Sequence, residues 1–263
     1  MSNARASSFD CGRVRRSRAA LRAGAARVAD IVRAALPQHC ELCVASTAGS
    51  LVCADCASTL PRVPAACPVC ALPSPEGTTC GACLAHPPPY AASVAAFVYA
   101  FPVDRLLQRI KYGGSIALTA WAGAALGTAV RAALARRCAE NGPDRIVALP
   151  LADARQRERG FNQAAEIAAH VAAACALPLA APLARVGGGP PQAALPWARR
   201  RSNVRGAFAV RSEVRDARIA LVDDVMTTGA TLTEASRMLI GAGAARVECW
   251  VVARTLRPEG RQS

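Results

Sequence analysis

The sequence predicts an α/β protein in which a parallel sheet is flanked by helices and preceded by a small cysteine-rich module. From about residue 91, short apolar runs alternate with longer segments of helical periodicity, which is typical of βαβ units around a buried parallel sheet. Residues 37–90 differ: they hold eight of the 12 cysteines, many prolines and glycines, and little hydrophobic periodicity. Such a segment buries little apolar surface, so something other than a core must hold it together.

Three domains follow from this division. Residues 1–36 form a basic arm, with apolar positions at roughly helical spacing up to Pro37, where proline ends the helix. Residues 37–90 form the cysteine module and residues 91–263 the α/β domain. The arm lacks the continuous apolar stretch of a signal peptide. Its Arg-rich, acid-poor composition also fits an organellar transit peptide, but a cytoplasmic location is the default expectation.

The bulk composition narrows the class of protein. Hydrophobic residues make up 52% of the chain, which excludes disorder for most of it. No run of eighteen or more uncharged apolar residues is present, so no membrane span is expected. The formal net charge is +14. This balance favours polyanionic partners such as nucleic acid or phosphorylated ligands, although arginine that only solvates Ala-rich helices would give the same number.

The α/β domain is expected to begin with a β-rich run and to end with an apolar strand. Between them, amphipathic or Ala-rich segments predict helices, and short apolar runs predict strands. In chain order, the expected elements are strand 94–101, helices 103–112 and 116–138, strand 146–150, helix 161–176, strand 219–223, helix 230–242 and strand 247–253.

The cysteine module contains four CxxC pairs, separated by nine, ten and nine residues. Two CxxC turns supply the four thiolates of a tetrahedral Zn²⁺, so four pairs predict two structural zinc ions with no open position for catalysis. A disulfide framework is the alternative, but it needs an oxidising compartment. We expect sequential pairs to share a zinc ion, and an interleaved arrangement remains open. The predicted ligands are Cys40, Cys43, Cys53, Cys56, Cys67, Cys70, Cys80 and Cys83.

A candidate ligand site follows the apolar strand 219–223, where the chain reads RIALVDDVMTTGATL from Arg218 to Leu232. The strand delivers Asp223 and Asp224 to the carboxyl end of the sheet, where open α/β folds bind ligands. The small and hydroxylated residues that follow let backbone N–H groups close around a phosphate at a helix N-terminus. Carboxylates suit the hydroxyl groups of a ribose, so the combination selects a sugar phosphate. The alternative is an acidic helix cap with an incidental turn.

This stretch resembles the diphosphoribose signature of type I phosphoribosyltransferases. Further segments resemble the competence protein F family, whose members carry a zinc ribbon before a transferase-like domain. The resemblance covers about residues 28–255 and rests on four segments besides the signature: RIKYGG (109–114), LPLADARQRERGFNQ (149–163), PPQAALPWARRRSNVRGAF (190–208) and GAGAARVECWVVART (241–255).

The resemblance implies a phosphoribosyltransferase-like fold with a double zinc ribbon, and it implies roles for particular residues. The acid pair would bind the ribose of 5-phosphoribosyl 1-diphosphate, with Mg²⁺ held chiefly by the ligand. Arginines of a flexible catalytic loop, 155–159, would stabilise the departing pyrophosphate. The residues implied in catalysis are Asp223, Asp224, Arg157 and Arg159. Those implied in ligand binding are Asp223 and Asp224 again, the phosphate loop Thr227, Thr228, Gly229, Ala230 and Thr231, the pyrophosphate loop Leu151, Ala152 and Asp153, and Lys111, the only lysine of the chain.

Two functions of different class remain open at this point. In the first, the chain is a phosphoribosyltransferase whose acceptor the sequence does not indicate. In the second, a non-catalytic scaffold serves DNA uptake, with the zinc ribbons and basic face contacting single-stranded DNA or a DNA-uptake helicase. The resemblance favours a transferase fold acting in natural competence. The scarcity of aromatic residues, 4% of the chain, disfavours a stacking groove for single strands.

Overall fold

The structure is a computed structural model that describes residues 38–47, 49–63, 65–137, 142–186 and 204–256. The predicted basic arm, residues 1–36, lies outside the described residues. The chain divides into two compact units, Met1–Ala57 and Ser58–Ser263, each of which is described by itself.

The first unit contains the first four cysteines of the module. Strands β1 (Gln38–His39) and β2 (Ser46–Thr47) pair antiparallel around the first CxxC turn. Helix α2 (Ala54–Thr59) begins directly after Cys53 and carries Cys56. Cys40 and Val52 are buried, Cys53 and Cys56 are half-buried, and Cys43 is exposed. So few buried groups are expected for a module without a core of its own.

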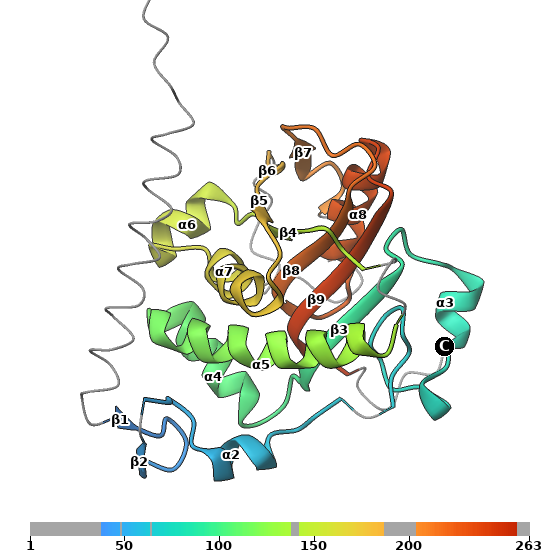
Figure 1. Ribbon diagram of the computed structural model, residues 1–263. Helices are drawn as coiled ribbons and strands as arrows, with labels where there is room; N and C mark the ends of the chain where they lie inside the picture. Colours follow the sequence, from blue (N-terminus) through green and yellow to red (C-terminus); the bar gives the residue numbers. More distant parts are fainter. Residues whose placement is uncertain (1–37, 48, 64, 138–141, 187–203, 257–263) are drawn as a thin grey trace, which may run out of the picture. The chain divides into compact units, whose positions relative to one another are not determined.

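The second unit is built on a five-stranded parallel sheet in the order β3-β9-β8-β4-β5 (Figure 1). The order confirms the predicted α/β class. A separate antiparallel pair, β6 and β7, lies outside this sheet and was not predicted. The bounds of the strands are β3 Ala92–Val98, β4 Arg145–Ala148, β5 Leu179–Ala180, β6 Leu183–Arg185, β7 Phe208–Val210, β8 Arg218–Met226 and β9 Arg246–Arg254.

The central strands β8 and β9 are buried on both faces, which explains the apolar runs 219–222 and 249–253 within them. Leu221 of β8 and Val251 of β9 belong to the core cluster that contains Leu232 and Leu239 of helix α8 (Ala230–Gly241). Because side chains alternate along a strand, the neighbouring residues point to the opposite face. Helix α8 therefore covers one face of the sheet.

Helices α5 (Ile116–Ala135) and α7 (Gln163–Cys175) pack against each other and against strands β3, β4, β8 and β9 (Figure 1). Their close approach depends on small residues. A Cβ atom on Gly123 would lie 2.4 Å from the Cβ of His170, so a larger residue there would push the two helices apart.

Two shorter helices frame the carboxyl end of the sheet. Helix α4 (Val103–Tyr112) buries its apolar side and ends at Gly113. Helix α6 (Asp153–Arg159) follows β4 and ends at Gly160, whose φ of 77° is a left-handed helix end.

Helix α5 is also long and apolar enough to cross a membrane by length and composition. That test is passed equally by the core helices of other proteins. About half of its most apolar window, 44%, is buried inside the protein, where α5 packs against α7 and the sheet.

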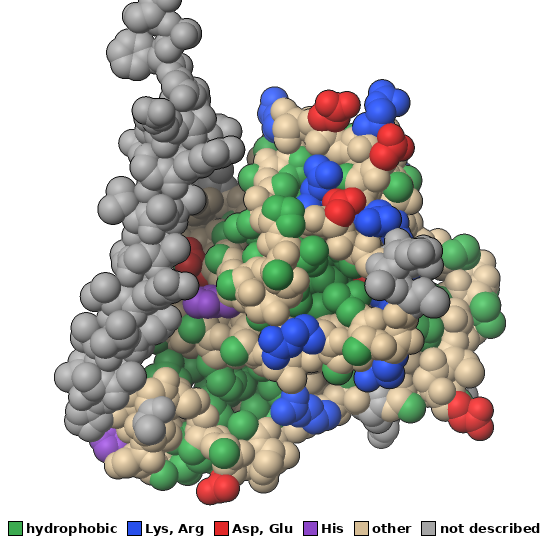
Figure 2. Space-filling view, in the orientation of Figure 1, with side chains coloured by type: hydrophobic (Ala, Val, Ile, Leu, Met, Phe, Trp, Pro, Cys, Tyr) green, Lys and Arg blue, Asp and Glu red, His purple; other side chains and the backbone are tan. Residues whose placement is uncertain are grey.

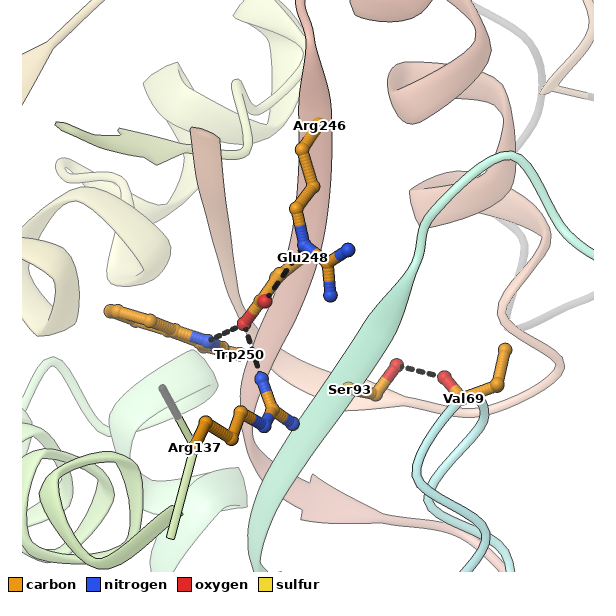
Figure 3. Close-up of polar contacts among 6 residues, drawn as sticks. All are labelled: Val69, Ser93, Arg137, Arg246, Glu248 and Trp250. Atoms are coloured by element: carbon orange, nitrogen blue, oxygen red, sulfur yellow. Dashed lines mark hydrogen bonds and ion pairs between the residues drawn. The ribbon is translucent and has the colours of Figure 1, made fainter. Parts of the chain in front are cut away.

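The second half of the cysteine module belongs to the same unit as the sheet. It contains a 3₁₀ turn, η1 (Pro75–Gly77), and helix α3 (Gly81–Ala85). The backbone N–H of Ser93 in β3 donates to the carbonyl of Pro68 at 2.9 Å, and its hydroxyl donates to the carbonyl of Val69 at 2.6 Å. Figure 3 shows the hydroxyl contact. The CxxC turn at Cys67 is thereby fixed to the edge of the sheet.

A buried acid lies near the start of β9. Glu248 is 1% exposed and forms ion pairs with Arg137 at 2.9 Å and Arg246 at 3.2 Å. The indole N–H of Trp250 donates to the same carboxylate at 3.4 Å (Figure 3). Two cations and a neutral donor thus compensate a charge that would otherwise be costly to bury.

Candidate functional site

The phosphate loop connects β8 to α8. Strand β8 ends at Met226, and Gly229 then adopts φ 79°, a left-handed conformation that glycine accepts without steric cost. The hydroxyl oxygen of Thr228 accepts the backbone N–H of Ala230 at 3.2 Å, which supports the turn. The chain therefore enters α8 through a tight loop of small residues, at a helix N-terminus suited to an anion.

The acid pair lies at the end of β8, before this loop. Lys111, from the last turn of α4, forms an ion pair with Asp224 at 3.0 Å. Their side chains are only 20% and 12% exposed. The backbone N–H of Asp224 donates to the carboxylate of Asp223 at 2.8 Å. Two acids and the only lysine of the chain are thus brought together from segments far apart in the sequence.

Burial and charge change the protonation of this group. Burial raises the pKa of Asp223 to about 8, and the neighbouring charge of Asp224 contributes to the rise. The N–H of Asp224 and the ammonium of Lys111 oppose that rise without cancelling it. Burial alone would lower the pKa of Lys111, but the ion pair with Asp224 outweighs it and the net shift is upward. At neutral pH the lysine is charged, whereas Asp223 holds a proton for most of the time.

These residues open into a cavity of about 360 Å³. Four cations from α4, α6 and β6 face two carboxylates in it, so its lining carries an excess of positive charge. The lining residues are Tyr99, Lys111, Tyr112, Leu149, Pro150, Leu151, Arg155, Arg159, Asn162, Gln163, Ala164, Arg185, Asp223, Asp224, Val225, Thr227 and Thr231.

Three donors on the wall of this cavity are buried and have no hydrogen-bond partner among the described residues: Nε of Arg159, Nε2 of Gln163 and Nε of Arg185. Gln163 is only 3% exposed. Buried donors are almost always satisfied. Three in one cavity indicate a site that receives an acceptor-rich ligand.

The guanidinium groups are held in place by aromatic rings. Arg159 lies over the ring of Tyr112 at 5.3 Å, and Arg185 lies over the ring of Phe208 at the same distance. Burial and the nearby Arg155 lower the pKa of Arg185. An anionic ligand between Arg155 and Arg185 would relieve their repulsion.

Some residues implied by the sequence line the cavity, and others do not. Leu151 of the pyrophosphate loop, Arg159 of α6, and Thr227 and Thr231 of the phosphate loop line it, together with the acid pair and Lys111. Arg157 is exposed and is not among the lining residues. The cavity is also not lined by Ala152, Thr228 or Ala230. Gly229 provides the left-handed turn at the start of α8. Asp153 begins α6, and its side chain lies outside the described part of the chain.

The expectation that residues 155–159 form a flexible loop is wrong. They belong to helix α6, which begins at Asp153, the last residue of the segment predicted to bind pyrophosphate. The helix has arginines in its last turn, which is favourable to the helix dipole. It has no apolar stripe, so hydrophobic periodicity did not predict it.

The cysteines form two clusters, in which the four sulfur atoms lie within 4.8 Å of one another. The pairing is sequential, as expected from the spacing. Their members are Cys40, Cys43, Cys53 and Cys56 in the first, and Cys67, Cys70, Cys80 and Cys83 in the second.

Comparisons with known proteins match both the cysteine module and the α/β domain. Residues 31–84 match the model of the double zinc ribbon domain, and residues 133–263 match that of the phosphoribosyl transferase domain. The chain is 33% identical over 227 residues to DNA utilization protein YhgH of Salmonella typhimurium, with 84% of this chain and 99% of the relative covered. The chain belongs to the competence protein F family. The YhgH protein of Escherichia coli K12 is 31% identical (78% of this chain, 91% of the relative), and Competence protein F of Haemophilus influenzae is 34% identical (66% and 78%).

The geometry of both clusters fits the zinc ions of a double zinc ribbon. Tetrahedral zinc with Zn–S bonds of about 2.3 Å places its ligands about 3.8 Å apart. The sulfur atoms of Cys43 and Cys53 are 3.7 Å apart, as are those of Cys70 and Cys80. Burial would raise the pKa of Cys40, but backbone N–H groups, that of Cys53 first, lower it to about 6. Each cluster thus presents sulfur at the spacing that a zinc site with four thiolate ligands requires.

The structure also shows which cavity residues sequence reasoning missed. Arg185 and Gln163 were not predicted as ligand residues, although both are buried or half-buried and carry unpaired donors among the described residues. Arg185 lies on β6, a strand of three residues that is too short for periodicity to reveal. Gln163 lies inside the segment GFNQ, and its position at the start of α7 was the only signal that could have indicated it.

Proposed function

We propose that this protein binds 5-phosphoribosyl 1-diphosphate together with Mg²⁺ in the cavity at the end of β8. We further propose that it acts in DNA uptake and utilisation on the cytoplasmic side of the membrane. The observation that carries the proposal is the meeting of Lys111, the acid pair and the phosphate loop in one cavity that three arginines also line. The role in DNA use rests on the names of the relatives, DNA utilization protein and Competence protein F.

The ligand matches the cavity group by group. The carboxylate of Asp224 and a carboxyl oxygen of Asp223 would accept the two ribose hydroxyls. Thr227, Thr231 and the N-terminus of α8 would hold the 5′-phosphate. The diphosphate carries several negative charges, for which the arginines of α6 and β6 provide guanidinium groups.

In a transfer reaction, a nitrogen nucleophile forms a bond to C1 of the ribose while the bond from C1 to pyrophosphate breaks. Positive charge develops on the ribose ring, close to Asp223 and Asp224, and negative charge on the departing pyrophosphate, close to Arg155, Arg159 and Arg185. The cavity thus places acidic groups beside the ribose and arginines beside the departing pyrophosphate. Mg²⁺, bound chiefly by ligand oxygens with help from the acid pair through water, would neutralise charge on the diphosphate.

Titration calorimetry with 5-phosphoribosyl 1-diphosphate and Mg²⁺ tests the proposal. The variant Asp223→Ala/Asp224→Ala removes charge-assisted hydrogen bonds worth roughly 1.5–3 kcal/mol each. We expect it to lose most of the affinity. The matched control is Glu213→Ala/Asp216→Ala, which removes two exposed acids. Absence of binding by the folded, zinc-loaded wild type would refute the proposed ligand.

A second candidate function is direct binding of single-stranded DNA. The zinc ribbons and the net charge of +14 favour it. Against a single dedicated groove, the Lys and Arg side chains of the described residues are scattered over the face shown in Figure 2 and do not form a continuous stripe there.

Fluorescence anisotropy with a labelled oligonucleotide over a salt series distinguishes the two functions. Binding to phosphates weakens steeply as salt rises. A DNA-binding scaffold would keep its affinity in Asp223→Ala, whereas the ligand proposal requires that variant to fail with 5-phosphoribosyl 1-diphosphate. Absence of salt-sensitive binding in the wild type would exclude the DNA-binding candidate.

A further inference from the structure

One buried side chain joins the second cysteine cluster to the phosphate loop. Arg254, the last residue of β9, is 4% exposed. Its Nε donates to the backbone carbonyl of Cys70 at 2.8 Å. Its Nη1 donates to the carbonyl of Met226 at 2.8 Å and also to that of Thr227. Cys70 belongs to the second cluster, whereas Met226 and Thr227 begin the phosphate loop.

The contacts of Arg254 determine how the loop presents its amides. In a trans peptide the C=O and the N–H point to opposite sides. With the carbonyls of Met226 and Thr227 turned toward Arg254, the N–H groups of Thr227 and Thr228 are directed away from it. Thr227 lines the ligand cavity. The arginine therefore sets the orientation of donors that a bound phosphate would use.

The other end of this link depends on the CxxC turn. The turn is fixed to β3 by two hydrogen bonds of Ser93, one to Pro68 and one to Val69; Figure 3 shows the second. Val69 also packs against the main core cluster, which includes Met226. The carbonyl of Cys70 keeps its place as long as this turn is folded. A structural zinc site supplies much of the folding free energy of such a turn.

We propose that Arg254 is a positioning residue that makes ligand binding by the phosphate loop depend on zinc in the second cluster, Cys67, Cys70, Cys80 and Cys83. The proposal rests on the function proposed above, in which the loop holds the 5′-phosphate. Zinc at the first cluster, in the other unit of the chain, has no such effect. The second ribbon is thus part of the ligand-binding domain and not an appended module.

The first test replaces the arginine. Arg254→Met keeps an apolar stem and removes every donor, and Arg237→Met, on the exposed side of α8, is the matched control. We expect Arg254→Met to bind 5-phosphoribosyl 1-diphosphate with Mg²⁺ about tenfold more weakly, a change of about 1.4 kcal/mol. Hydrogen exchange at the amides of residues 227–231, measured without ligand, should become faster. The zinc content should stay at two ions per chain, since Arg254 is not a ligand of the metal.

The second test removes zinc from one cluster at a time. Cys83→Ser acts on the second cluster and Cys43→Ser on the first. Each variant should lose one zinc ion, by colorimetric assay. Only Cys83→Ser should show weaker ligand binding and faster exchange at residues 227–231.

The outcomes separate the two proposals. If the wild type does not bind the ligand, the proposed function fails, and the exchange rates alone decide the role of Arg254. If Arg254→Met binds and exchanges like the wild type, or if Cys43→Ser loosens the loop as much as Cys83→Ser, the role of Arg254 is refuted. Should Arg254→Met not fold, Arg254→Lys replaces it. A single ammonium cannot reach all three carbonyls, so the same loosening is expected from it.

Discussion

Replacement of Asp223 by asparagine should make the protein more stable at alkaline pH. The pKa of Asp223 is about 8 in the folded protein, because the carboxyl group is enclosed and lies beside Asp224. In the unfolded chain an aspartate has a pKa of about 3.9. The folded state therefore holds the proton more tightly. The stabilising effect of this proton on the folded state is complete below the pKa that Asp223 has in the unfolded chain. It is lost as the pH rises through about 8.

The size of the effect follows from this difference. Between pH 6 and pH 8 the folded state loses about half of the proton of Asp223, whereas the unfolded chain is already deprotonated. The free energy of unfolding then falls by at most about 2 kcal/mol from this residue. Asparagine resembles the protonated carboxyl group and keeps an oxygen for the N–H of Asp224. Asp223→Asn should lack this fall, so its advantage over the wild type should grow with pH.

Denaturant unfolding at pH 6, 7 and 8, followed by tryptophan fluorescence with zinc in excess, measures the difference. The control is Asp144→Asn. Burial opposes ionisation of Asp144, but the backbone N–H of Arg218 and the nearby arginines lower its pKa. It therefore titrates below this window and should leave the pH slope unchanged. Parallel profiles for the wild type and Asp223→Asn would show that Asp223 is ionised throughout, and the reasoning would be refuted.

Three further substitutions test other parts of the structure. Lys111→Met leaves the charge of Asp224 uncompensated, so it should lower the free energy of unfolding in denaturant by about 3 kcal/mol and lose most of the ligand affinity. An unchanged ligand affinity by calorimetry would show that the lysine does not contribute to the binding site. Gly229→Ala places a side chain at φ 79°, with its Cβ 3.3 Å from Met226, and should cost about 1 kcal/mol and weaken binding; a more stable variant would contradict the left-handed turn. Glu248→Gln leaves two arginines without a counter-charge and should lower the melting temperature without changing ligand affinity; loss of affinity would mean that the two sites are coupled.

The fold was predictable because its central elements have strong local signals. The apolar run of β8 ends in two acids, and the helix after it follows a turn of small residues, so strand, site and helix could be read from one segment. The CxxC spacing likewise predicted both clusters and their sequential pairing. In these segments the residues that determine the local structure lie close together in the sequence.

The rest of the site depends on contacts between distant segments. Nothing in the sequence near Lys111 indicates that its ammonium meets Asp224, because the ion pair requires α4 to end beside β8. Arg185 reaches the cavity from a three-residue strand that forms only through its pairing with β7. Arg254 reads as the polar end of a buried strand, and its partners lie 28 and 184 residues away along the chain.

The free-energy cost of burying the acid pair bears on whether the cavity still binds a ligand or has lost that function. A protein that serves only as a scaffold gains nothing from a carboxyl group that resists ionisation at neutral pH, or from a lysine held against a second acid in a half-buried position. Neutral or apolar residues of similar size would stabilise the same fold better, since buried ion pairs seldom compensate for their lost hydration. Perturbed acids in a cavity with unpaired donors are typical of sites that bind and act. If the chain also binds DNA, Asp223→Ala/Asp224→Ala should leave that activity intact, because the two substitutions leave every arginine in place. A variant that keeps DNA binding and loses the sugar phosphate would show that one chain carries two separate activities.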